Sequence, residues 1–182
     1  MKYVREGKMC TYGETPVAAL EERVRRLEDR EAIREILHHY TRAVDRNDVG
    51  GIISCYTEDG CFLPGDKSKP VSGRENIMEV LGRLMNADIK TSAHHIANQQ
   101  IYFETPDMAV VYACFYANKS FYQGREDEIT WGGYELRVVR DTDGEWRIKT
   151  HKVFFTRQDG SRTGRFGEQM DRPWPPEPEY LA

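Results

Sequence analysis

The chain has 182 residues, of which 39% are hydrophobic and 31% are charged, as expected for one globular domain with a sizeable core. The net charge of −4 argues against a nucleic-acid-binding surface. No apolar run approaches the roughly 20 residues that cross a membrane. The polar start lacks the apolar stretch of a secretory signal, so we expect a cytoplasmic protein without nucleic-acid or membrane partners.

The cysteines indicate a reducing compartment. None belongs to a C-x-x-C pair, and none lies at zinc-ligand spacing from a histidine. We interpret them as reduced packing thiols and expect neither a metal site nor a disulfide framework. They are Cys10, Cys55, Cys61 and Cys114.

The first third of the chain is predicted to be helical after a polar arm at residues 1–16. Residues 17–45 show two apolar stripes at helical spacing. The gap between Leu27 and Ile33 breaks the phase and predicts a kink or a new helix start with Asp29 as its cap. We expect the first stripe to contact a partner subunit and the second to face the chain's own core. The first consists of Leu20, Val24 and Leu27, and the second of Ile33, Ile36, Leu37, Tyr40 and Val44.

A short helix, a strand ending at Leu63 and a helix over residues 73–86 are expected next. The second half contains four long segments rich in aromatic and β-branched residues, separated by turn signals, which predict an antiparallel meander. Helices first and strands afterwards indicate an α+β fold with a curved sheet wrapped over the helices. Residues 158–182 are rich in Pro, Gly and charge and predict an extended tail, with Phe166 and Trp174 as anchors.

Two polar features do not fit the apolar pattern. Asp45 lies at the edge of the second stripe, where it either faces water as a cap or enters the core. His94 begins a strand with polar residues on both faces, which indicates either a partly exposed sheet or a wet cavity. Histidine carries protons near neutral pH, and a carboxylate on its second nitrogen would orient it. Three other histidines, His38, His39 and His151, are expected at the surface or rim.

The order of these segments resembles the SnoaL-like branch of the nuclear-transport-factor-like superfamily. The resemblance runs through "LEDREAIREILHHYTRAVDRND", "SGRENIMEVL", "HHIANQQIYFET" and "YELRVVRDTDGEWRIKTHKVFF" and covers roughly residues 20–157. It implies a cone-shaped α+β barrel at residues 17–157, with about three helices against a strongly curved sheet and an internal pocket. Its members are commonly trimers or dimers, so a homotrimer or homodimer is expected.

In the dehydratases and the dehydrochlorinase of this branch, an aspartate at the end of the first long helix pairs with a histidine that opens a central strand. The resemblance places these roles on Asp45 and His94. It adds Tyr40, which matches a tyrosine of the bile-acid enzyme, and Asn98, which matches a recurring asparagine. Two positions depart from the pattern. Where some members carry a second histidine or acid, this chain has Ala117, Asn118 or Lys119, and a late-strand arginine has two candidates, Arg137 and Arg140.

The resemblance implies a cofactor-independent lyase acting on a bulky, mostly apolar aromatic, steroid or polyketide-like molecule. His94 would take a proton, Asp45 would orient it, and Tyr40 would stabilise the leaving oxygen. Loss of water, or of a small fragment such as formaldehyde, would use these parts. A double-bond isomerase and a non-catalytic ligand-binding or oxygenase-subunit module remain alternatives. The expected substrate-binding residues are Asn98, Tyr112, Tyr116, Asn118, Trp131 and Arg137.

Overall fold

The structure is a computed structural model that describes residues 17–64, 69–85, 89–122, 124 and 126–159. The predicted arm with Cys10, and the predicted tail beyond Asp159 with Phe166 and Trp174, lie outside the described residues. None of the described helices is long and apolar enough to cross a membrane. The elements in chain order are α1 (Val17–Asp45), α2 (Val49–Ser54), β1 (Tyr56–Leu63), β2 (Val71–Ser72), α3 (Arg74–Met85), β3 (Ile89–Thr105), β4 (Met108–Phe121), β5 (Glu128–Arg140) and β6 (Trp146–Asp159).

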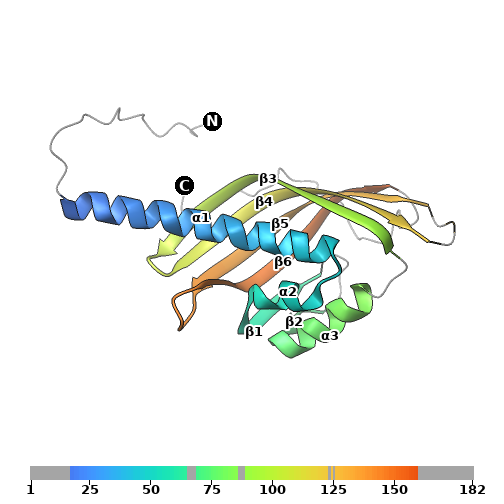
Figure 1. Cartoon of the computed structure of the whole chain (residues 1–182), viewed down its shortest axis with the longest axis horizontal. Coiled ribbons are helices and arrows are strands. Elements are labelled where there is room, and N and C mark those ends of the chain that lie inside the picture. Colours follow the sequence, from blue (N-terminus) through green and yellow to red (C-terminus); the bar gives the residue numbers. More distant parts are fainter. Residues whose placement is uncertain (1–16, 65–68, 86–88, 123, 125, 160–182) are drawn as a thin grey trace.

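The strands form one mixed, curved sheet in the order β2-β1-β6-β5-β4-β3. The predicted meander of β3 to β6 is antiparallel, and β1 pairs parallel with β6. In Figure 1, α1 runs along the sheet, and α2 and α3 gather beside β1 and β2. The predicted α+β fold, with a curved sheet against N-terminal helices, is confirmed. The sheet is open rather than a closed barrel, because β2 and β3 are its edges.

The strand register gives the sheet an inner face toward the helices and an outer face away from them. Successive side chains of a strand alternate between the two faces. In β4 the inner side chains belong to the same core as Ile33 and Leu37 of α1. These inner residues are Ala109, Val111, Ala113, Phe115 and Ala117. The side chains between them, including Tyr112, Tyr116 and Asn118, therefore point to the outer face.

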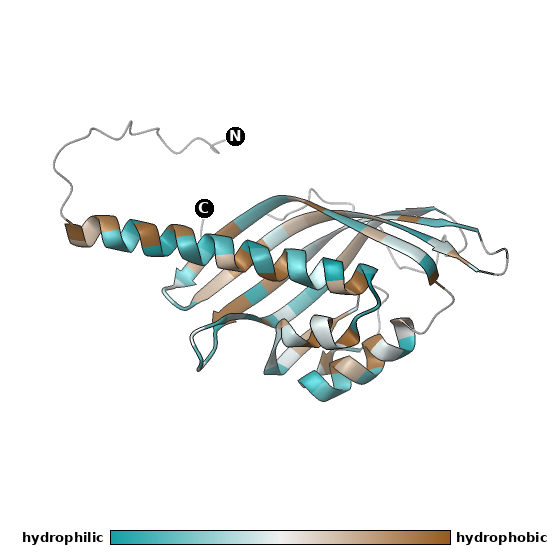
Figure 2. Cartoon of the chain, viewed as in Figure 1, coloured by the Kyte–Doolittle hydropathy of each residue, from teal (hydrophilic) through white to brown (hydrophobic). Residues whose placement is uncertain are grey.

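Helix α1 is continuous through Asp29, so the predicted kink or new helix start there is wrong. Asp29 is a buried anchor rather than a cap: its carboxylate accepts a hydrogen bond from the Trp146 indole (3.0 Å) and pairs with Arg140. The phase break has another cause. The second stripe faces the core, whereas the first stripe, beginning at Leu20, faces away from it and is exposed. In Figure 2, hydrophobic residues appear on the turns of α1 that extend past the sheet.

Candidate active site

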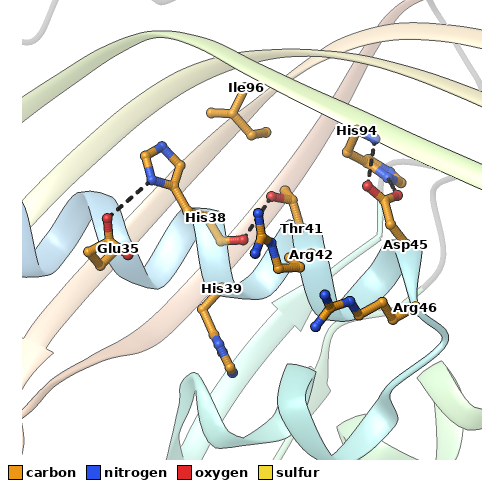
Figure 3. Close-up of a pocket in the computed structure, with 9 residues that line it drawn as sticks. All are labelled: Glu35, His38, His39, Thr41, Arg42, Asp45, Arg46, His94 and Ile96. Carbon is orange, nitrogen blue, oxygen red and sulfur yellow. Dashed lines mark hydrogen bonds and ion pairs between the residues drawn. The ribbon is translucent and has the colours of Figure 1, made fainter.

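The last residue of α1 and a residue near the start of β3 meet at the edge of the sheet. Asp45 Oδ1 lies 2.6 Å from His94 Nδ1 and accepts a hydrogen bond from the Ser92 hydroxyl at 2.9 Å. Its other oxygen, Oδ2, accepts the backbone N–H of His94 at 2.9 Å. Both carboxylate oxygens are thus engaged by one short segment of β3, which fixes the relative position of the two side chains (Figure 3).

Electrostatics keep the carboxyl group ionised. Burial alone would raise the pKa of Asp45, but the hydrogen bonds from the His94 ring, the His94 backbone and Ser92 outweigh it and hold this pKa below its usual range. An ionised carboxylate can only accept, so the proton between the two side chains belongs to Nδ1 of His94. This tautomer leaves the Nε2 lone pair available to take a proton.

The pair opens on a groove of about 720 Å³ between the C-terminal half of α1 and β3. Its lining is mainly polar, whereas the resemblance implied an internal pocket for a mostly apolar molecule. The difference arises because the space between α1 and the inner sheet face is filled by buried side chains such as Leu37 and Tyr56, each at most 2% exposed. The groove residues are Glu35, His38, His39, Thr41, Arg42, Asp45, Arg46, His94 and Ile96.

The outer parts of this groove are rich in groups that bind oxygen-containing ligands. His38 and His39 are exposed, as predicted, and lie near Gln99 (3.5 Å) and Ser54 (3.4 Å) respectively. The side chains of Arg42 and Arg46 have no ion-pair or hydrogen-bond partner among the described residues. Across the described ranges, no three His, Cys, Asp or Glu side chains are grouped as metal ligands would be.

The structure places Tyr40 in the core behind the pair rather than in the groove. It is 7% exposed, and its ring contacts those of Tyr56, Tyr134 and His151 at centroid distances of 4.9 to 6.3 Å. Burial raises the pKa of Tyr40 well above its usual range. Tyr134 connects this aromatic cluster to the pair, because it stacks on Phe115 at 4.7 Å and the Phe115 ring lies 6.3 Å from that of His94. Tyr40 is therefore part of the buried aromatic core and reaches the pair through Tyr134 and Phe115.

The six residues expected to bind substrate do not line the groove. His94 pairs with Ala117, so it shares the inner face with the odd-numbered residues of β4, and the neighbouring tyrosines point outward. The outer aromatic rings contact one another instead: Tyr116 lies 5.8 Å from His95 and 5.5 Å from Trp131. The assignment of the six expected residues to this pocket is therefore corrected. Asn98 is exposed, with φ 53° at a bulge of β3. The other five lie on the outer face: Tyr112, Tyr116, Asn118, Trp131 and Arg137.

The late-strand arginines also lie away from the pair. Arg137 is exposed and lies 3.4 Å from Glu104. Arg140 lies at the end of β5, where it pairs with Asp29 near the middle of α1 and with Asp107. Neither can stand in for an arginine that contacts a substrate in this groove.

His151 was expected at the surface and is fully buried. Its Nδ1 lies 2.8 Å from the Tyr56 hydroxyl, and its Nε2 has no partner among the described residues. Burial lowers the pKa of His151 to about 3, so the ring is neutral. Strict alternation from the buried Ile148 would turn His151 outward, but a register shift between β5 and β6 at Arg137/Val138 reverses the faces. No feature of the sequence marks that bulge.

Comparison with known proteins agrees with this architecture. A model of the SnoaL-like domain matches residues 25–152. A candidate scytalone dehydratase from Novosphingobium aromaticivorans has 22% identity and a TM-score of 0.74, covering 82% of this chain and 97% of that one. A candidate aromatic ring hydroxylase from the same species has 25% identity and a TM-score of 0.67, covering 75% and 95%.

More distant relatives have the same arrangement. A hexachlorocyclohexane dehydrochlorinase from Novosphingobium barchaimii has 16% identity and a TM-score of 0.68, with 75% of this chain and 92% of that one covered. A search of curated proteins found no match. At such identities the solved structures establish the shared fold.

Proposed function

Because this chain belongs to the family of SnoaL-like domains, we propose that it is a lyase that uses Asp45 and His94 as an acid–base pair. The observation that carries this proposal is the contact of the Asp45 carboxylate with His94 Nδ1 at the edge of a groove large enough for a small molecule. Relatives that are described as a dehydratase and a dehydrochlorinase support the reaction class.

The proposed step is an elimination. Nε2 of His94 takes a proton from the substrate carbon, the electrons of that C–H bond form the new double bond, and the bond to the leaving oxygen breaks. The imidazolium, stabilised by the charge of Asp45, then returns its proton to the departing hydroxide as water forms. In the alternative that loses formaldehyde, His94 takes the proton of a hydroxymethyl group, and the electrons of that O–H bond form the C=O bond of formaldehyde. The neighbouring C–C bond breaks, its electrons form the C=C bond, and hydroxide leaves the next carbon and takes the proton from His94 as water.

The groove supports a more oxygenated substrate than the sequence suggested. Arg42 near the end of α1 and Arg46 just after it flank Asp45 without described partners. An arginine binds a carboxylate by two parallel hydrogen bonds and can donate a charge-assisted hydrogen bond to a phenolate oxygen. The proposed substrate is therefore an aromatic, steroid or polyketide-like hydroxy compound with an anionic or phenolic group at one end. No contact with the substrate is assigned to Tyr40, since its ring is buried.

The test is a substrate screen with matched variants. Purified protein is incubated with hydroxylated steroids, polyketide-type compounds and lignin-type aromatic alcohols, and loss of water or formaldehyde is followed by mass spectrometry. His94→Ala should abolish turnover, whereas His95→Ala, which changes the adjacent outward-facing ring, should retain it. Turnover that survives unchanged in His94→Ala would remove the proposed base.

An isomerase is the second candidate, because the same base could move a double bond by abstracting and returning a proton. A ketosteroid isomerase-like protein from Erwinia carotovora atroseptica has 16% identity and a TM-score of 0.61, covering 70% of this chain and 95% of that one. A product that has the mass of its substrate in H₂O and incorporates deuterium when the reaction is run in D₂O would identify this reaction. A protein that binds such ligands without converting any of them would instead be a binding or subunit module.

The cellular setting is part of the proposal. Cys55, Cys61 and Cys114 are free thiols, which supports a reducing compartment such as the cytoplasm. We also propose that the protein forms a homodimer or homotrimer.

A further inference from the structure

The N-terminal half of α1 carries an apolar stripe that no described residue covers. Its four side chains are 71%, 44%, 51% and 66% exposed, in the order Val17, Leu20, Val24 and Leu27. Figure 1 shows this part of α1 extending past the sheet. Contact with the rest of the domain begins further along, where the Arg26 guanidinium lies 4.4 Å from the Phe103 ring and Asp29 is buried.

Such an extension has little reason to stay helical alone. Isolated helices of fewer than about 12–15 residues are marginal in water, and most helical stability in proteins comes from packing of an apolar face. The stripe is such a face, and its neighbours are charged. We refer to Val17, Leu20, Val24 and Leu27 as the N-terminal stripe.

The spacing of the N-terminal stripe is that of a coiled coil. Its residues recur at intervals of three, four and three, which makes Val17 and Val24 heptad positions a, and Leu20 and Leu27 positions d. Valine at a with leucine at d favours two parallel strands. We propose that the N-terminal stripe pairs with the same stripe of a second copy of this chain, as a parallel two-stranded coiled coil.

The charges beside the stripe select this orientation. Glu21 and Glu28 occupy the e positions and Arg23 a g position, and none of the three has an ion pair among the described residues. In a parallel pair, Arg23 of each copy faces Glu28 of the other. In an antiparallel pair, glutamates would face glutamates and arginines would face arginines. The second copy therefore complements the flanking charges only when the helices run in the same direction.

The contact is short and ends at a defined point. The next a and d positions are Glu31 and Arg34, both charged, so the apolar seam stops after Leu27 and the helices can diverge toward their own domains. The rest of α1 is already fixed on its sheet, so helix nucleation costs this interface little. A seam of two heptads predicts a dimer that dissociates on dilution.

The first test is the double variant Leu20→Glu/Leu27→Glu. Sedimentation of the full chain over a concentration series should show a dissociating dimer for the wild type and a monomer for the variant. Because both side chains are exposed in the single chain, the domain should still fold, and its cooperative unfolding transition should be retained. A wild-type monomer at every concentration would overturn the proposal, as would an assembly whose mass the variant leaves unchanged. The first result would mean that the stripe does not bind a second copy, and the second that another surface assembles the protein.

A second test reports orientation. A cysteine at an a position forms a symmetric disulfide only when two helices run parallel and in register, so Val24→Cys should cross-link under mild oxidation. Glu22→Cys, on the opposite side of the helix, and the wild type are the controls. Equal cross-linking at both positions would contradict the parallel seam.

Charge reversal completes the design. Arg23→Glu and Glu28→Arg alone should each weaken dimerisation roughly three- to tenfold, because two pairs in the dimer become repulsive. The double reversal should restore the wild-type dissociation constant. Failure of the double variant to recover would exclude the predicted pairing. All three tests are independent of the proposed enzymatic activity.

Discussion

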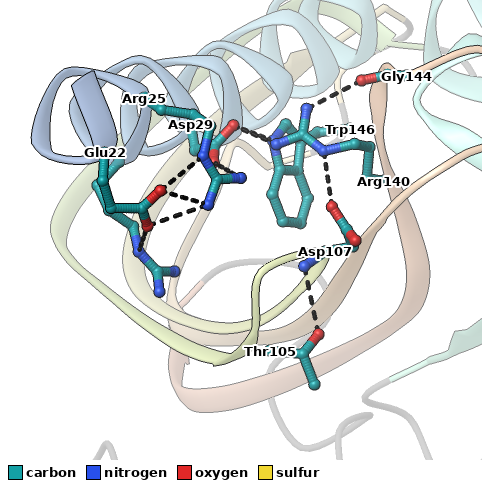
Figure 4. Close-up of polar contacts among 9 residues, drawn as sticks. Glu22, Arg25, Asp29, Thr105, Asp107, Arg140, Gly144 and Trp146 are labelled. Atoms are coloured by element: carbon teal, nitrogen blue, oxygen red, sulfur yellow. Dashed lines mark hydrogen bonds and ion pairs between the residues drawn. The ribbon is translucent and has the colours of Figure 1, made fainter. Parts of the chain in front are cut away.

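Helix α1 presents two carboxylates to the sheet, and their partners differ in kind. Asp29 is held by the Trp146 indole and by Arg140, with Arg25 at 4.0 Å, and its side chain is 7% exposed (Figure 4). Asp45 is held by the ring and backbone of His94 and by Ser92, and its side chain is 22% exposed. Both pKa values lie below the usual range, because hydrogen bonds outweigh burial at each site.

The difference lies in what the partners can do with a proton. An arginine keeps its proton at any physiological pH, so the cluster around Asp29 can only hold elements together. It ties α1 to the end of β5 and the start of β6, and through Asp107 to the turn between β3 and β4. A histidine gives and takes protons near neutral pH, and that of Asp45 borders the groove. Similar acids on one helix thus serve architecture at one end and, as we propose, chemistry at the other.

The largest effect is expected on activity, and it distinguishes the catalytic role proposed for Asp45 from the structural role of Asp29. Asp45→Asn should lower kcat roughly 10²- to 10⁴-fold, because the amide no longer stabilises the His94 imidazolium. The free energy of unfolding should fall by roughly 1–2 kcal/mol, because the two side chains are only 8% (His94) and 22% (Asp45) exposed but the amide keeps one acceptor oxygen for the β3 segment. Steady-state kinetics and urea unfolding on the same preparation measure both quantities. A variant that loses stability but keeps its kcat would place Asp45 with the structural acids.

Asp29→Asn should show the reverse pattern. The substitution leaves the Arg140 guanidinium without its buried anion, and the free energy of unfolding should fall by roughly 1–3 kcal/mol. Turnover per folded molecule should be unchanged. Arg140→Gln in the same background is the matched control, because the loss in the double variant should be smaller than the sum of the two single losses. Additive losses would show that the two residues act independently.

Asp29 and Asp45 also show how much of the structure could be predicted from the sequence. The stripes of α1 and the aromatic meander predicted the helices, the sheet and their packing, because local periodicity reports which faces are buried. The proximity of Asp45 to His94 came from the family resemblance, since no local pattern brings a helix end to a distant strand. Asp29 was misread as a cap because its partners, Arg140 and Trp146, are remote in sequence.

The sequence also did not predict which face of the sheet several residues occupy. Tyr112, Tyr116 and Trp131 are as aromatic as the inner Phe115 and Tyr134, so composition cannot separate them. The pairing of His94 with Ala117 decides the matter, and pairing is a tertiary property. In β6 a single register shift reversed the face of His151, and irregularities of this kind leave no trace in an alternating pattern.

His151 extends the comparison to a buried polar group without a counter-charge. The unfolded chain binds a proton near the ordinary histidine pKa of about 6.5, whereas the folded chain does so only near a pKa of about 3. Acid therefore favours unfolding: stability should fall by up to about 1.4 kcal/mol per pH unit below 6.5 and level off below about 3.

The control is His151→Gln, which keeps a polar partner for Tyr56 and cannot titrate. Urea unfolding at a series of pH values should show a steeper loss for the wild type between pH 6 and about 4. The acids do not confuse this window, because the lowered pKa values of Asp29 and Asp45 confine their own loss of stability to pH below about 4. Parallel curves for the two proteins would show that His151 is protonated in the folded state.

The smallest expected effect concerns the arginines near the two carboxylates. Arg25 and Arg140 already pair with Asp29, whereas Arg42 and Arg46 border the groove without described partners. With an anionic substrate, Arg42→Gln and Arg46→Gln should each raise KM roughly three- to tenfold with little change in kcat, as expected when a contact is equally strong in the ground and transition states.

Added salt should raise the wild-type KM in the same direction, because partly exposed charges are screened. Arg34→Gln is the matched control, since Arg34 lies on the same helix, pairs with Glu31 and does not border the groove. An equal rise in KM for Arg34→Gln and Arg42→Gln would show that the effect comes from the net charge of α1 and not from a contact with the substrate. A lower kcat in Arg42→Gln alone would instead indicate that this guanidinium contacts the leaving group. The catalytic machinery would then include Arg42 as well as Asp45 and His94.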